Sequence, residues 1–241
     1  MEFGILGPLR VRTGDGRSLP VTGTKPRTML AALLLAGGRV LPDDRLAALL
    51  WGGREPATMA AQLHTYASRL RRALDVPLVR SGPGYLLERG MDVRFDADEF
   101  ERLTLSGHRD LEAGLPELAV TRLRAALDLW RGPALADVSE TLRAAELPRL
   151  EEIHMAAVEG RIAAELALGQ HLRAVPDLVG LVARYPLRER LRAQLVTALH
   201  RSDRRTDALG VYAQGRRILD EELGVAPGPA LRAAYQSVLS A

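Results

Sequence analysis

Short apolar segments separated by glycine and proline turns occur only in the part of the chain before Phe95. Between Met1 and Thr22 the turns Gly7-Pro8 and Thr13–Gly16 interrupt isolated apolar residues, a pattern typical of short strands. From Phe95 onward strand signals vanish, and apolar residues recur at helical spacing in one segment after another. The sequence therefore predicts a mainly α chain, with an α+β domain at residues 1–92 and an all-α domain at residues 93–241.

The first domain has the element order of a winged helix-turn-helix. Thr24 is a plausible N-cap and Pro26 suits a first helical position, while Gly37-Gly38 and Gly52-Gly53 suit helix ends. Ser81–Gly84 lies between two apolar segments, as in a β-hairpin. The expected elements after the first strands are helices over 26–36, 42–51 and 56–74 and a hairpin over 77–88.

The third predicted helix has the character of a helix that enters the major groove of DNA. Its apolar stripe consists of Met59, Leu63, Tyr66, Leu70 and Leu74. The opposite side holds Gln62, His64, Thr65, Arg69 and Arg72. An arginine in this position can donate two hydrogen bonds to a guanine edge or bind phosphate. The alternative is a solvated basic helix face, but its place between a helix pair and a basic hairpin favours DNA.

Further candidate contacts lie outside this face. Arg80 and Ser81 sit on the hairpin, where a wing follows the phosphates, although an ordinary turn is the alternative. Lys25 and Arg27 stand at a helix N-terminus and either contact phosphate or remain solvated. Trp51 either packs in the core or lies against a sugar. The full predicted DNA-binding set is Lys25, Arg27, Trp51, Thr58, Gln62, His64, Thr65, Tyr66, Arg69, Arg71, Arg72, Arg80 and Ser81.

The second half repeats itself with a period of 34 residues, as Ala164 and Ala198 or Ala174 and Ala208 show. Small residues at such positions allow helices to cross closely, as in tetratricopeptide repeats. Pro186 also falls where such a repeat places its proline. This half is therefore predicted to be a helical solenoid of about three repeats.

Composition and motifs argue against an enzyme or a membrane protein. The chain has no cysteine, its five histidines lack metal-ligand spacing, and it has neither a phosphate-binding loop nor a nucleophile elbow. No apolar segment is long enough to span a bilayer, so we expect a cytoplasmic protein without cofactor. Residues 1–92 contain 13 Lys and Arg against 8 Asp and Glu, whereas the remainder has 20 against 22. The positive charge thus concentrates where DNA is expected.

Several segments resemble one family. The chain is similar to the Streptomyces antibiotic regulatory protein family in Gly23–Leu35, Leu49–Gly52, Tyr66–Leu74, Gly82–Tyr85, Leu129–Leu135, Pro186–Leu191 and Asp220–Gly228. The last three resemble that family's bacterial transcriptional activation domain. Together the segments extend over essentially the whole chain.

The resemblance implies an OmpR-type winged helix that binds direct repeats near a promoter −35 element, with molecules side by side on the DNA. It also implies recruitment of RNA polymerase through the sigma factor and the C-terminal domain of the polymerase α chain, usually for secondary-metabolite gene clusters. Arg69 matches the family's groove-facing arginine, and Arg80 and Ser81 lie on its wing. Ala60-Ala61 departs from the Arg-Asn that members often carry, so the preferred DNA sequence is expected to differ.

Two further expectations concern regulation and a rival function. The chain has no room for a phosphoacceptor receiver domain, so control is expected to lie in its own expression or in an unidentified ligand. The rival function is a protein–protein scaffold, in which the helical repeats act and the winged helix is vestigial. Salt-dependent binding to specific DNA distinguishes the two.

Overall fold

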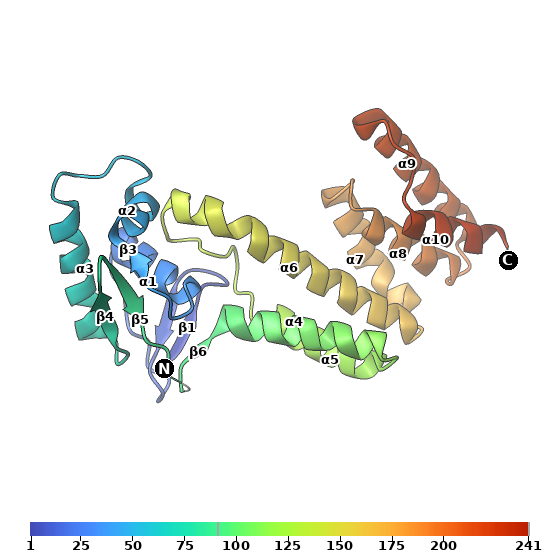
Figure 1. Cartoon of the computed structure of the whole chain (residues 1–241). Helices are drawn as coiled ribbons and strands as arrows, with labels where there is room; N and C mark the ends of the chain where they lie inside the picture. The colour runs from blue at the N-terminus through green and yellow to red at the C-terminus, as the bar shows by residue number, and fades with distance from the viewer. Residues whose placement is uncertain (91, 241) are drawn as a thin grey trace. The chain divides into compact units, whose positions relative to one another are not determined.

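The computed structural model describes residues 1–90 and 92–240, and its strands occur in the N-terminal part as predicted (Figure 1). The strands are β1 (Glu2–Gly4), β2 (Arg10–Arg12), β3 (Leu41–Pro42), β4 (Leu78–Ser81), β5 (Gly84–Leu87) and β6 (Arg94–Phe95). The helices are α1 (Thr24–Leu35), α2 (Asp43–Trp51), α3 (Met59–Ala73), α4 (Asp96–Glu112), α5 (Pro116–Leu127), α6 (Glu140–Ala167), α7 (His171–Arg184), α8 (Glu189–His200), α9 (Arg205–Leu223) and α10 (Pro229–Leu239). The predicted fold class is confirmed.

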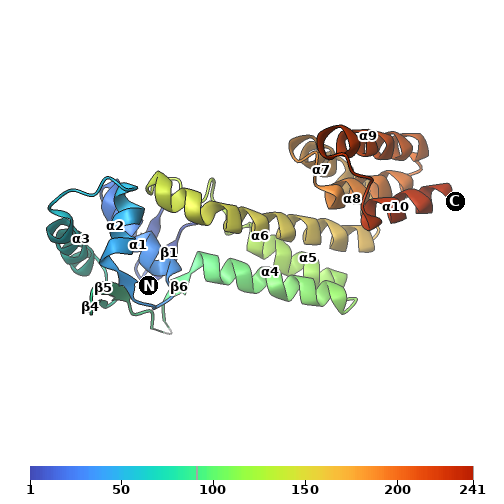
Figure 2. The ribbon, with the colours of Figure 1, turned by 45° about the horizontal axis from the view of Figure 1, so that its top comes forward.

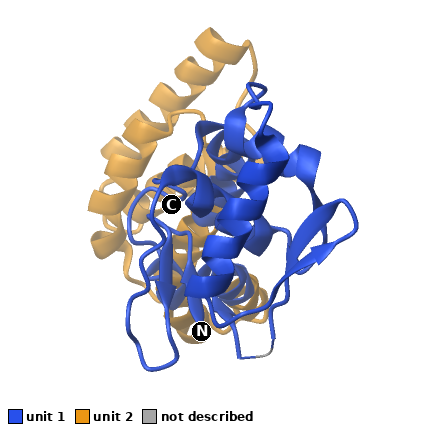
Figure 3. Ribbon diagram, turned by 90° about the vertical axis from the view of Figure 1, so that its left-hand side faces the viewer, with its two compact units in different colours: residues 1–104, 125–154 blue, residues 105–124, 155–241 orange. Residues whose placement is uncertain are grey.

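Packing divides the chain into two compact units (Figure 3). The first comprises residues 1–104 and 125–154, and the second comprises residues 105–124 and 155–241. The division into functional domains after residue 92 stays a prediction. The segment 90–93 in which we expect this boundary includes residue 91, which lies outside the described residues.

The strands of the first unit form two small sheets. In one, β1 lies between β2 and β6, antiparallel to the former and parallel to the latter. In the other, β5 lies between β3 and β4, and Arg80 pairs with Tyr85 in the predicted hairpin. Gly84 lets β3 approach β5 closely, because a Cβ there would lie 2.8 Å from the carbonyl carbon of Leu41.

The helices α1, α2 and α3 enclose the core of this unit. The helix α1 is buried along almost its whole length, so it forms the centre of the trio. Gly52 ends α2 in the left-handed conformation, with φ 65°. The helix α3 begins at Met59 rather than near Pro56, because Thr58 is not helical and the Met59 N–H closes a turn onto the Pro56 carbonyl.

A segment beyond the winged helix also belongs to the first unit. Residues 131–139, here called the strap, hydrogen-bond along the N-terminal segment and α1. The Arg131 N–H donates to the Leu6 carbonyl at 2.7 Å, and the Leu135 N–H donates to the Ile5 carbonyl at 2.9 Å. At its far end, the Ser139 hydroxyl donates to the Leu49 carbonyl at 2.6 Å. The strap therefore satisfies backbone groups of the first unit that would otherwise be buried without partners.

The second unit contains the repeated helix pairs. The helices α7 and α9 begin 34 residues apart, at His171 and Arg205, in agreement with the predicted period. The small residues Ala174 and Ala208 are buried at equivalent places in them. The helix α8 packs against α7, α9 and α10, which Figure 2 shows grouped around it.

Two helices of the C-terminal half differ from the sequence expectation. The sequence predicts a start for α6 at Leu147, next to Pro148, but the helix begins at Glu140 and contains the proline. The proline removes an N–H donor that would bond to the carbonyl of Ala144, and that residue is exposed, so water can replace the donor. The helix α10 was not identified in the sequence, although Pro229 stands in its first turn.

We expect Gly84→Ala to destabilise the winged helix. The new Cβ would lie within 2.9 Å of backbone atoms of Leu41 and Pro42, which cannot rotate away as a flexible side chain can. The free energy of unfolding should fall by roughly 1–3 kcal/mol, the usual cost of overpacking. Gly14→Ala is the matched control, because nothing lies within 4 Å of its Cβ position. Urea denaturation followed by circular dichroism measures both, and equal stabilities would contradict the close approach of β3 to β5.

Candidate nucleic-acid interface

The helix α3 is anchored by one face and exposed on the other. Leu63, Ala67 and Leu70 are buried, whereas Met59 and Tyr66 of the predicted stripe are half-buried. The exposed side chains are Ala60, Ala61, His64, Thr65, Arg69, Arg71 and Arg72. In Figures 1 and 2 this helix lies at the edge of the first unit. Its exposed face is therefore open to a large partner.

Three of the predicted side chains bond to one another along α3. The Tyr66 hydroxyl donates to Oε1 of Gln62 at 3.0 Å, and Nε2 of Gln62 donates to the Thr58 hydroxyl at 3.0 Å. The Tyr66 ring also lies 6.4 Å from the ring of Trp51, which stands half-exposed at the end of α2. Gln62 therefore has partners on its own helix for both ends of its amide.

The three arginines of α3 have different environments. Among the residues that the structure describes, no carboxylate forms an ion pair with Arg69. Nε of Arg72 reaches only the Ser68 carbonyl, at 3.4 Å. By contrast, Nε of Arg71 donates to the Leu78 carbonyl at 2.6 Å, and its guanidinium lies 6.0 Å from the Tyr85 ring centroid. Arg71 thus ties α3 to β4, while Arg69 and Arg72 have no ion-pair partner among the described residues.

The hairpin arginine already has an anionic partner. Both terminal nitrogens of Arg80 donate to the Asp43 carboxylate, at 2.6 and 2.7 Å, and its guanidinium lies 4.6 Å from the Tyr85 ring centroid. The hydrogen bond to Asp43 raises the pKa of Arg80 above its ordinary value. The Arg80 side chain is 45% exposed, so this pair contributes little to stability. Ser81 pairs with Gly84 and is half-buried.

The two basic residues at the start of α1 also have partners within the unit. The Lys25 ammonium donates to the Leu50 carbonyl, in the last turn of α2, and lies 5.7 Å from the Trp51 ring centroid. Nε of Arg27 donates to the Val21 carbonyl at 2.8 Å and lies 3.5 Å from a carboxylate oxygen of Asp137 in the strap. The phosphate contacts expected of Lys25 and Arg27 stay predictions.

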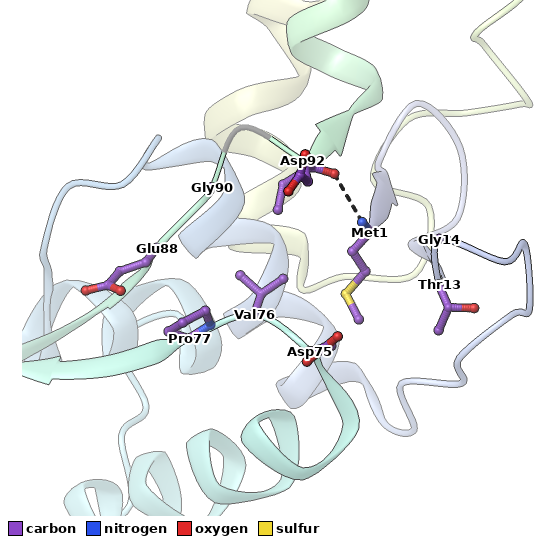
Figure 4. Close-up of a pocket in the computed structure, with 10 residues that line it drawn as sticks. Met1, Thr13, Gly14, Asp75, Val76, Pro77, Glu88, Gly90 and Asp92 are labelled. Carbon is purple, nitrogen blue, oxygen red and sulfur yellow. Dashed lines mark hydrogen bonds between the residues drawn. The ribbon is translucent and has the colours of Figure 1, made fainter.

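A cavity of about 300 Å³ lies near the base of the hairpin (Figure 4). Asp75, Glu88 and Asp92 are among its lining residues, and the N-terminal ammonium of Met1 donates to the Asp92 carbonyl at 3.2 Å. This acidic lining disfavours phosphate. Within residues 1–90 and 92–240, no group of acidic or histidine side chains is placed to hold a metal ion, and no helix is long and apolar enough to cross a membrane.

Comparison with known proteins identifies the family. The family model described as bacterial transcriptional activator domain matches residues 95–239. Regulatory protein DnrI of Streptomyces peucetius is 40% identical over 100% of this chain and 93% of its own length. The chain belongs to the Streptomyces antibiotic regulatory protein family. It is a transcriptional regulator.

Two other relatives match essentially the whole of this chain but a smaller share of their own length. Transcriptional regulator RedD of Streptomyces coelicolor is 37% identical over 100% of this chain and 71% of its own length. The solved structure titled Mycobacterium tuberculosis EmbR in complex with low affinity phosphopeptide matches 99% of this chain and 65% of its own, with a TM-score of 0.90 and 34% identity. The fold of this regulator is therefore shared along essentially its whole length.

Sequence reasoning missed two residues near α3, the exposed Arg54 and the half-buried Asp43. Arg54 is exposed in the loop between α2 and α3, and none of the described residues forms an ion pair with it. It lies outside the regular elements, so no periodicity marked it, although a basic residue just before a helix predicted to enter DNA is itself a signal. Asp43 stands in the first turn of α2, and its pairing with Arg80 could not be seen in the sequence because it joins residues 37 positions apart.

We expect Lys25→Met to lower stability through the loss of a helix-end contact. The substitution removes the ammonium that bonds to the Leu50 carbonyl and faces the Trp51 ring. The free energy of unfolding should fall by about 1 kcal/mol, whereas Lys25→Arg, which keeps the charge, should change it less. Tryptophan fluorescence during urea denaturation measures both. An unchanged stability of Lys25→Met would mean that the ammonium does not hold the end of α2.

Proposed function

We propose that the chain is a sequence-specific transcriptional activator that acts in the cytoplasm. Residues 1–92 bind promoter DNA at direct repeats near the −35 element, with two molecules side by side. Residues 93–241 recruit RNA polymerase through the sigma factor and the C-terminal domain of the polymerase α chain. Membership of the Streptomyces antibiotic regulatory protein family supports regulation of antibiotic biosynthesis genes.

One observation carries the DNA-binding part of this proposal. The exposed face of α3 presents Arg69 and Arg72 without carboxylate partners among the described residues, beside a hairpin that carries Arg80. A helix of this kind fits the major groove, while a neighbouring hairpin follows the backbone. Acidic side chains are absent from α3, so the whole face is compatible with a polyanion.

The first test is a mobility-shift assay with a salt titration on fragments recovered by genome-wide footprinting. Affinity should fall steeply with salt, because each neutralised phosphate releases counterions. A competitor DNA of random sequence serves as the control and should bind more weakly at every salt concentration. Absence of any specific site would overturn the activator proposal and favour the helical-repeat scaffold.

We expect Arg69→Ala to weaken specific binding by about 1–3 kcal/mol and to relax the preference at one base pair, because a guanine contact is lost. Arg72→Ala is the comparison. If Arg72 binds phosphate, its loss should weaken binding to all sequences similarly and lower the salt slope by about 1. Binding to a library of single-base variants of the site measures both. An unchanged base preference in Arg69→Ala would exclude base reading by this residue.

We expect Asp43→Asn to strengthen DNA binding, because the Asp43 carboxylate competes with phosphate for Arg80. The gain in binding free energy should be about 1 kcal/mol relative to Asp44→Asn. Asp44 is an exposed neighbour in the same first turn of α2, so its replacement removes the same charge from the same helix end. The gain should disappear when Arg80 is also replaced by glutamine. Fluorescence anisotropy at constant salt measures all of these. Weaker binding by Asp43→Asn than by Asp44→Asn would show instead that Asp43 positions Arg80 on the DNA.

A further inference from the structure

Small side chains form one line along α3, of which Ala61 and Thr65 are exposed and Ser68 is half-buried. Ala61, Thr65 and Ser68 follow one another at spacings of four and three, so they share one side of the helix, opposite the buried Leu63 and Leu70. Arg72 ends this line. Small residues along it let the helix axis approach the floor of a groove more closely than long side chains would.

The Thr65 side chain is held in one orientation by its own helix. Its hydroxyl donates to the Ala61 carbonyl at 2.9 Å, one turn earlier. The polar atom is therefore turned back to the backbone, and the Thr65 methyl is the group left to meet a partner. The Ala61 side chain is itself a methyl.

The side-chain amide of Gln62, next to Ala61, is not free to donate to a base. Its nitrogen donates to Thr58 and its oxygen accepts from Tyr66, so reading an adenine with both ends would require both bonds to break. The exposed face of α3 thus presents the methyl groups of Ala61 and Thr65 along its centre. His64 lies on one side of this line and Arg69 on the other.

We propose that Ala61 and Thr65 read thymine through its C5-methyl group, an inference that rests on the proposed DNA binding. Thymine is the base whose major-groove edge carries a methyl group, and alanine and threonine methyls are suited to contact it. Arg69 lies one turn beyond Thr65, about 6 Å along the helix axis. The preferred half-site therefore contains a thymine near the guanine that Arg69 reads.

The test removes this methyl from the DNA. A site selected in vitro by the full chain is resynthesised with deoxyuridine in place of each thymine in turn, which deletes the C5-methyl and leaves every hydrogen-bonding group. At one or two positions affinity should fall about fourfold, the value of one buried methyl group. Deoxyuridine outside the half-sites is the control and should have no effect.

Two substitutions distinguish the contribution of the Thr65 methyl from that of its hydroxyl. Thr65→Ser keeps the hydroxyl and removes the methyl, so the difference between thymine and deoxyuridine should vanish at one position. Thr65→Val keeps the methyl and removes the hydroxyl, so the difference should persist. Thr65 is exposed, and circular dichroism of both variants should match that of the unchanged chain.

The outcomes distinguish this inference from the function on which it rests. Specific, salt-sensitive binding that is indifferent to deoxyuridine at every position would overturn methyl reading and leave the activator proposal standing. Discrimination that survives in Thr65→Ser and disappears in Thr65→Val would assign the reading to the hydroxyl and would also overturn the inference. Failure of the unchanged chain to select any sequence would remove both proposals.

Discussion

The buried carboxylate of Asp96 joins three segments that are distant in sequence. Its oxygens accept hydrogen bonds from the backbone N–H groups of Ile5 and Leu6, at 2.8 and 3.2 Å, and from Arg131 at 3.1 Å. Burial raises the pKa of Asp96, while these hydrogen bonds act in the opposite direction. A buried acid without such partners would be costly, so the end of β1, the start of α4 and the strap are fixed together.

The remaining contacts of the strap extend this arrangement to the helices beneath the candidate DNA surface. Asp137 accepts from the Leu9 N–H at 2.8 Å, and the Ser139 N–H donates to the Thr28 hydroxyl at 2.8 Å. The Ser139 hydroxyl then reaches α2 through the Leu49 carbonyl. The strap thus braces α1 and α2, whereas α3 keeps its polar face exposed. The proposed base recognition by α3 requires both rigid supporting helices and an exposed helix face.

Local patterns predicted well the features that depend on neighbouring residues. The apolar stripe of α3 and the hairpin around Gly84 follow from spacing and turn chemistry, so they are visible in the sequence. The partners of the basic residues are not, because Lys25 bonds to a carbonyl 25 residues away and Arg80 to a carboxylate 37 residues away. Sequence reasoning could identify arginines suited to DNA, but only the fold shows that Arg69 lacks an ion-pair partner among the described residues and Arg80 has one. The start of α6 was missed because a proline suggests the beginning of a helix, whereas Pro148 stands at an exposed position inside this one.

The strap has a consequence for how such regulators diversify. The region that matches the activator-domain family begins at residue 95, yet it supplies Asp96, Arg131 and Ser139 to the unit that contains α3. Recombination that exchanged only the first 92 residues between two family members would therefore pack a winged helix from one protein against the strap of another. An exchange that keeps these contacts has to extend through the strap. If α3 reads the promoter as proposed, point substitutions on its exposed face change the preference without disturbing these contacts.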